Sequence, residues 1–124
     1  MNRARLLLAV LVAVSAALPA AALAHRRASN VERAAILTAV VRQQQLSRAQ
    51  AACQVVTIST VDRDYASVTW PRKLSRACSR VAANGVIIER RAARGWTFVT
   101  VGSEFHCPIH GVPTRVARDL NVCF

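Results

Sequence analysis

The sequence is poor in acidic residues and contains no internal repeat or low-complexity linker. Only six aspartates and glutamates oppose 17 lysines and arginines, which gives a formal net charge of +11 over 124 residues. The absence of a repeat or a linker excludes a division into several units, and the length supports one domain.

The chain also lacks a convergent set of catalytic side chains and a nucleic-acid-binding motif. Aromatic residues make up only 5% of the sequence and are not interleaved with the basic residues. These absences argue against an enzyme and against specific recognition of nucleic acid. The sequence therefore predicts a binding module without a cofactor or a metal ion.

The first 24 residues have the features of a secretory signal peptide. Two arginines precede an apolar run from Leu6 to about Leu18, and an A-x-A cleavage site follows at 22–24. The run is too short to span a bilayer comfortably, so a retained anchor is the less favoured alternative. We expect a signal peptide over 1–24, a single secreted disulfide-stabilised domain over 25–124, and no transmembrane segment after cleavage.

All four cysteines, Cys53, Cys78, Cys107 and Cys123, lie after this leader. An even number of cysteines in a short exported chain predicts two disulfides. Three pairings are possible, and the sequential one, Cys53 with Cys78 and Cys107 with Cys123, is favoured because it joins neighbouring elements. Closing loops of about 25 and 16 residues stabilises a fold by about 3 to 4 kcal/mol per bridge.

One cysteine lies between two histidines in the stretch EFHCPIHGVP, at 104–113. His106, Cys107 and His110, together with Cys123, can supply ligands to zinc, and a cysteine beside a histidine can act as a nucleophile. A cysteine in a disulfide can do neither. The paired ligand spacing of structural zinc sites is also absent, so the stretch favours a disulfide anchor.

Hydrophobic patterning and turn residues predict an α+β domain. A capping-box pattern at Ser29 and Glu32 begins a helix over about 30–45. Strand-forming residues around polar turns at 62–64 and 93–95 predict two hairpins, with short helices after each. We expect the N-terminal helix to pack on a four-stranded antiparallel sheet made of the two hairpins, with a cystatin-like outline and two disulfides.

Six basic residues are candidates for binding an anionic surface. The leader removes two of the 17 basic residues and no acidic one, which leaves a balance of +9. Such a charge favours an anionic cell-envelope polymer or an acidic protein as partner, whereas a solvated basic surface without a partner is the alternative. The six are Arg72, Lys73, Arg76 and Arg80 on the second predicted helix, and Arg91 and Arg94 at the tip of the second hairpin.

Three stretches resemble small secreted actinobacterial proteins of unknown function. They are ISTVDRDYASV at 58–68, GWTFVTVGS at 95–103 and VPTRVARDLNVC at 112–123. The resemblance implies export and a shared fold, but no activity. We therefore expect a small secreted non-enzymatic binding or interaction module of unknown specific function.

A narrower resemblance concerns the stretch CPIHGVP, from Cys107 to Pro113. It is similar to the reactive loop of the Streptomyces subtilisin inhibitors, in which a disulfide-anchored Cys-Pro precedes the scissile position. The resemblance implies a secreted serine protease inhibitor as the alternative function, with Ile109 presented to the protease and His110 after the scissile bond. A loop that a bridge and two prolines hold in its bound shape loses little entropy on docking.

Overall fold

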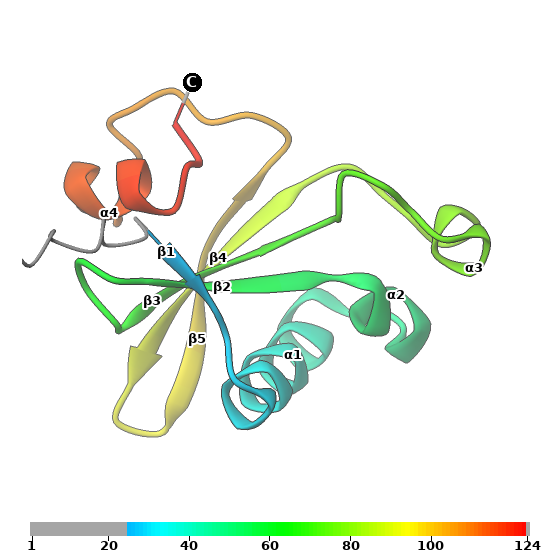
Figure 1. The fold of residues 1–124 in the computed structure, drawn as a ribbon. Coiled ribbons are helices and arrows are strands. Elements are labelled where there is room, and N and C mark those ends of the chain that lie inside the picture. The colour runs from blue at the N-terminus through cyan, green and yellow to red at the C-terminus, as the bar shows by residue number, and fades with distance from the viewer. Residues whose placement is uncertain (1–24, 124) are drawn as a thin grey trace, which may run out of the picture.

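The computed structural model describes residues 25–123, so the predicted signal peptide lies outside the described residues. These residues form an α+β fold with a five-stranded antiparallel sheet in the order β1-β2-β3-β4-β5 (Figure 1). No helix in this part of the chain is long and apolar enough to cross a membrane. The elements are β1 His25–Arg27, α1 Asn30–Gln44, α2 Arg48–Cys53, β2 Val55–Ser59, β3 Tyr65–Thr69, α3 Arg76–Ser79, β4 Val86–Ala92, β5 Gly95–Gly102 and α4 Thr114–Asp119.

Both predicted hairpins are present, and each joins neighbouring strands of the sheet. In the first, Val56 of β2 pairs with Val68 of β3. In the second, β4 and β5 pair from Val86 with Gly102 to Ala92 with Gly95, and the register shifts once near Ile88. The predicted count of four strands was nevertheless wrong, because the structure adds a fifth strand before α1.

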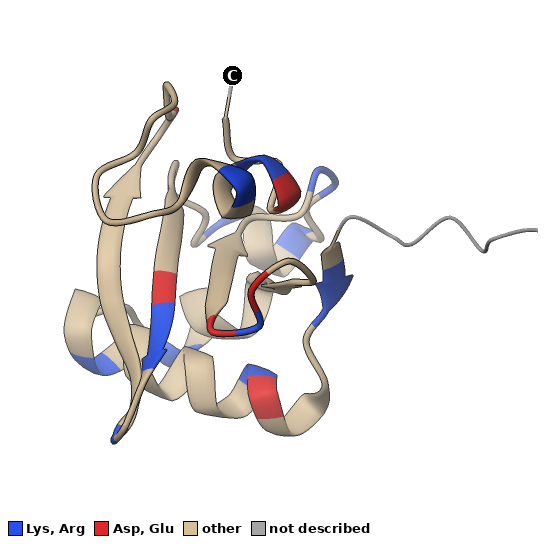
Figure 2. Cartoon of the chain, turned by 90° about the vertical axis from the view of Figure 1, so that its left-hand side faces the viewer, with Lys and Arg blue, Asp and Glu red and all other residues tan. Residues whose placement is uncertain are grey.

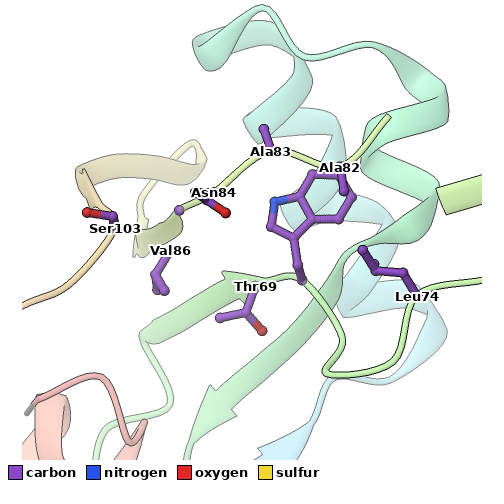
Figure 3. Close-up of a pocket in the computed structure, with 9 residues that line it drawn as sticks. Thr69, Leu74, Ala82, Ala83, Asn84, Val86 and Ser103 are labelled. Carbon is purple, nitrogen blue, oxygen red and sulfur yellow. The ribbon is translucent and has the colours of Figure 1, made fainter. Parts of the chain in front are cut away.

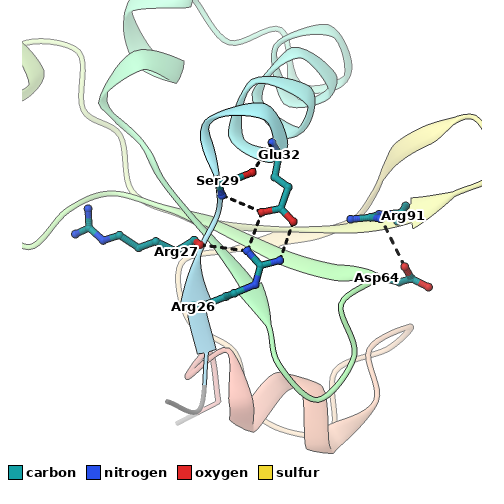
Figure 4. A network of polar contacts seen from close by, with 6 residues as sticks. All are labelled: Arg26, Arg27, Ser29, Glu32, Asp64 and Arg91. Atoms are coloured by element: carbon teal, nitrogen blue, oxygen red, sulfur yellow. Dashed lines mark hydrogen bonds and ion pairs between the residues drawn. The ribbon is translucent and has the colours of Figure 1, made fainter. Parts of the chain in front are cut away.

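The additional strand, β1, has only three residues, pairs with β2, and is tied to α1 by polar contacts. The guanidinium of Arg26 donates two hydrogen bonds of 2.7 Å to the carboxylate of Glu32 in α1 (Figure 4). The hydrogen bonds from Arg26 and from the backbone of Ser29 lower the pKa of Glu32 to about 2. A strand of sequence HRR is too short and too polar for hydrophobic alternation to predict.

The sheet is covered on both faces. Helix α1 begins at the predicted capping box of Ser29 and Glu32, and it covers one face. Its buried residues pack on Val56, Val68 and Ile87 of the sheet. Helix α4 and the C-terminal tail cover the other face, where Val116 and Leu120 belong to a second core with Ile88. Figure 1 shows α1 and α4 on opposite sides of the strands.

Both predicted disulfides are present, with the sequential pairing. Cys53 at the end of α2 is bonded to Cys78 in α3, and Cys107 is bonded to Cys123 in the tail. The two Cα atoms of each bridge are 5.6 Å apart. One bridge therefore joins the helical side of the sheet to the segment between β3 and β4, and the other closes the layer that contains α4.

A buried carboxylate ties α4 to the first hairpin. Asp119 accepts hydrogen bonds from the Ser59 hydroxyl at 2.6 Å and from the Thr60 amide at 2.8 Å. Burial raises the pKa of Asp119, but the hydrogen bonds from Ser59, Thr60 and Val61 outweigh burial and leave the pKa below its ordinary value. The Nδ1 atom of His25 donates to the Asp119 carbonyl oxygen at 2.9 Å, so the same residue also holds β1.

Glu89 of β4 is fully buried on the α1 side of the sheet. Ile87 lies two residues before Glu89 on the same face of β4, and Ala66 of β3 lies directly opposite Glu89. Both belong to the core beneath α1. Neither carboxyl oxygen of Glu89 has a hydrogen-bond partner among the described residues. This burial raises the pKa of Glu89 to about 7, because an ionised carboxylate in an apolar layer is poorly solvated.

We expect Glu89→Gln to remove a pH dependence of stability. The pKa of Glu89 is about 7 in the folded state against an ordinary value of 4.5. The stabilisation of the fold that comes from protonated Glu89 is therefore fully present below pH 4.5 and is lost as pH rises through 7. Its ionisation should lower the wild-type free energy of unfolding by roughly 1 to 3 kcal/mol across that window. Urea unfolding at several pH values measures the effect. Glu104→Gln, at an exposed position, is the control; equal pH profiles for E89Q and wild type would contradict the prediction.

Candidate functional site

Four of the six basic candidates lie together in the segment between β3 and β4. Helix α3 is shorter than predicted, because it comprises only Arg76–Ser79 after an N-cap at Ser75. Arg72 and Lys73 therefore precede the helix, which corrects the prediction that all four basic residues lie on it. All four side chains are exposed, and we call them the basic flank: Arg72, Lys73, Arg76 and Arg80.

The other two basic candidates lie at the opposite end of the sheet. Strand β4 begins beside the segment that carries the basic flank and ends at the second hairpin, and its seven residues span about 20 Å. Arg91 lies over the ring of Trp96 at 5.1 Å and is 3.9 Å from Asp64, while Arg94 is exposed in the turn. The six residues thus form two groups, and Figure 2 shows basic residues spread over several elements.

The cations of the basic flank have no acidic neighbours that neutralise them. The sequence contains no aspartate or glutamate between Asp64 and Glu89. In the described part of the chain, the ion pairs involve Arg26 with Glu32 and Arg91 with Asp64, and none involves the flank. Of the remaining acids, Glu89 and Asp119 are buried, Asp62 lies in the turn of the first hairpin, and the exposed Glu104 forms no ion pair with the flank. The flank therefore presents positive charge without an ion-pair partner to solvent.

A hollow of about 280 Å³ lies beside the basic flank, at the end of the sheet where β3 ends and β4 begins. Its wall is the segment Ala82–Gly85, which leads from α3 into β4. Gly85 has φ of 139°, a conformation that favours glycine. Figure 3 shows Leu74 and Ser103 at opposite sides of the hollow. The side chains that bear on its chemistry are Thr69, Trp70, Leu74, Asn84, Val86 and Ser103.

A second hollow of about 110 Å³ adjoins the first, and the two share Trp70, Ala83, Asn84 and Gly85 in their walls. It is mainly apolar, with Leu46, Ile87 and Val101 in its wall. Gln54 also contributes to the wall and is only 5% exposed. We call the two hollows together the Trp70 hollow.

Several polar groups of the Trp70 hollow have no partner within the described residues. No hydrogen bond engages the side chains of Thr69, Asn84 or Ser103, or the indole N–H of Trp70. The side-chain oxygen of Gln54 is buried and also lacks a partner. Buried polar groups are normally hydrogen-bonded, so the orphan oxygen of Gln54 is unusual, whereas Asn84 and Ser103 are exposed and Thr69 and Trp70 are half-buried. A hollow with a few free polar groups around an aromatic ring is typical of a ligand site.

The position of this site depends on few contacts, since only four residues between β3 and β4 are helical. The Cys53–Cys78 bridge joins the segment to α2. The side-chain amide of Gln50 in α2 donates to the carbonyl oxygen of Val81 at 3.3 Å, next to the wall of the hollow. The bridge is therefore the main connection that holds the basic flank and the hollow in place.

The remaining candidates lie in the loop 104–113, on the other side of the sheet. Ile109, the residue expected to contact a protease, is 8% exposed and belongs to the core beneath α4, whereas His106 and His110 are exposed. A reactive loop must insert this side chain into the protease, so its burial does not support the inhibitor alternative. Cys107 and Cys123 are bonded to each other, and the described residues contain no group of three potential metal ligands.

Neither Trp70, Gln54 nor Asn84 was identified as a site residue from the sequence, and α2 was not predicted. A signal for α2 was present, because Ser47 and Gln50 have capping-box spacing, and both capping hydrogen bonds are formed. No local pattern indicates the hollow, since its residues come from distant parts of the chain.

Comparison with protein-family models finds no match, and no curated protein or solved structure is significantly similar to the chain. The candidate site therefore rests on its own geometry.

Removal of the Cys53–Cys78 bridge should loosen the site more than the sheet. For the Cys53→Ala, Cys78→Ala double variant we expect a free energy of unfolding lower by about 3 kcal/mol. Hydrogen exchange in 70–85 should become faster, while exchange in the paired strands stays slow. Mass spectrometry of peptic fragments measures this. The Cys107→Ala, Cys123→Ala variant is the matched control and should leave 70–85 protected; unchanged exchange in 70–85 without the first bridge would contradict the assignment.

Proposed function

We propose that the protein is a small exported binding module, without enzymatic activity, whose basic flank binds an anionic polymer of the cell envelope. The observation that carries the proposal is the group of four exposed cations without an ion-pair partner in the described structure. Such a surface attracts polyanions through electrostatics. At physiological ionic strength salt largely screens this attraction beyond a distance of about 8 Å.

The placement of the titratable residues supports a binding role over catalysis. Histidine and carboxylate side chains are the usual acids and bases of enzymes, and they must reach a common cleft. Here His25 and Asp119 are engaged in structural hydrogen bonds, and Glu89 is sealed beneath α1. None of these groups lines the Trp70 hollow.

Export is part of the same proposal. Two disulfides in a domain of this size are consistent with an oxidising compartment. The leader at 1–24, with its basic start and A-x-A end, supports passage across a membrane. A polymer of the envelope is favoured over an acidic protein because the flank is followed by a hollow that fits a small repeated unit, and not by a broad apolar surface.

The Arg76→Gln, Arg80→Gln variant should bind polyanions about tenfold more weakly than wild type at low salt. A fluorescently labelled polyuronate oligosaccharide and inorganic polyphosphate serve as probes, and anisotropy measures binding. Raising the salt from about 20 mM to about 150 mM should weaken wild-type binding markedly.

The matched control for this experiment is the Arg63→Gln, Arg94→Gln variant, which loses the same charge from two exposed turns at the opposite end of the sheet. We expect a change of less than about twofold from this control, since long-range attraction is screened. Equal losses in both variants, salt-independent binding, or no binding to either probe would reject the proposal.

A further inference from the structure

We infer that the Trp70 hollow binds one sugar unit of an anionic glycan whose charged groups contact the basic flank. This inference rests on the proposed function, because the flank supplies the attraction for the polymer. It goes further by naming a second contact, of different chemistry, and thereby the class of polymer.

The first argument is the mixed chemistry of the hollow. Trp70 and Leu74 supply apolar surface, and Thr69, Asn84 and Ser103 supply polar groups around it. An apolar ligand would displace water from those polar groups without replacing its hydrogen bonds, which costs free energy, and a bare phosphate would gain nothing from the apolar face of the indole or from Leu74. A sugar ring has apolar C–H faces and a rim of hydroxyls, so it can satisfy both kinds of surface at once.

The second argument is the unsatisfied acceptor inside the hollow. Gln54 is 5% exposed, and its side-chain oxygen has no hydrogen-bond partner in the described structure. A ligand hydroxyl that enters beside Trp70 can donate to this oxygen. The indole N–H of Trp70 can in turn donate to a ligand oxygen, because no described residue accepts from it.

The third argument is size and position. The larger part of the Trp70 hollow has a volume of about 280 Å³, near the lower limit of about 300 Å³ for small-molecule pockets, and the smaller part, which Gln54 lines, adds about 110 Å³. This space suits one ring and not a long chain segment. The hollow is continuous along the chain with the flank, since Leu74 lies next to Lys73 and Ala82 lies two residues after Arg80. One repeat of a polymer can occupy the hollow while its neighbours lie along the cations.

The test compares four probes on the purified protein with both disulfides intact. The probes are a uronic-acid hexasaccharide, inorganic polyphosphate of matched charge, a neutral glucose hexasaccharide, and polyglutamate as an acidic peptide. We expect the uronic-acid probe to bind about tenfold more tightly than polyphosphate at equal salt. It should also shift the fluorescence of Trp70, while Trp96, which is buried in the core, does not respond.

Variants separate the sugar contact from the charge contact. Trp70→Ala should weaken binding of the uronic-acid probe about tenfold. Asn84→Ala, which removes only an exposed side chain, should weaken it about threefold. Both should leave polyphosphate binding within about twofold. Asn30→Ala, at an exposed asparagine outside the hollow, is the matched control. Circular dichroism of each variant verifies the fold.

Each alternative outcome has one meaning. Equal binding of polyphosphate and the uronic-acid probe, with neither Trp70 nor Asn84 affecting it, overturns the sugar contact and leaves the proposed function intact. Failure of both the uronic-acid probe and polyphosphate overturns both proposals. Tight binding of the neutral hexasaccharide overturns the charge contribution alone, and Trp70-dependent binding of polyglutamate with no binding of the uronic-acid probe overturns the glycan in favour of an acidic protein.

Discussion

The two disulfides constrain the layers that cover the sheet. Five strands expose two faces, and a chain of this length covers each with little helix, α1 and α2 on one side and α4 with the tail on the other. The segments at 70–85 and 103–113 have almost no regular structure, so backbone hydrogen bonding alone does not position them. The bridges Cys53–Cys78 and Cys107–Cys123 do so, because each joins such a segment to a helix or to the terminus.

The unequal use of charge distinguishes the two ends of the sheet. At the hairpin end, Asp64 lies near Arg91, and Arg26 is paired with Glu32 beside β1 (Figure 4). At the other end, the flank has no acidic partner and borders a hollow with free polar groups. A cation in an ion pair attracts an anionic ligand less, because its charge is already compensated, whereas an unpaired cation can still attract such a ligand. The candidate site therefore lies where the fold leaves both charge and hydrogen-bonding capacity unused.

The local part of the architecture could be predicted from the sequence. Ser29 and Glu32 specify the start of α1 through contacts within one turn, and polar turns between β-branched runs specify both hairpins. The strand β1 could not be predicted, because its place depends on Arg26 reaching Glu32 and on His25 reaching Asp119 at the far end of the chain. The extent of α3 was overestimated, because Arg72, Lys73 and Arg80 were expected on this helix and lie outside its four residues.

By itself the sequence determined the positive balance and the order of the longer elements, and it favoured the sequential pairing of the cysteines that the structure confirms, because these follow from composition and from neighbours along the chain. Only the tertiary structure decided that Glu89 is sealed beneath α1, that Ile109 is buried, and that Arg91 is remote from the flank. It also formed the hollow, whose Gln54, Trp70 and Val101 come from three distant stretches. Such groupings depend on how strands pair and layers pack, and no local pattern in the chain encodes them.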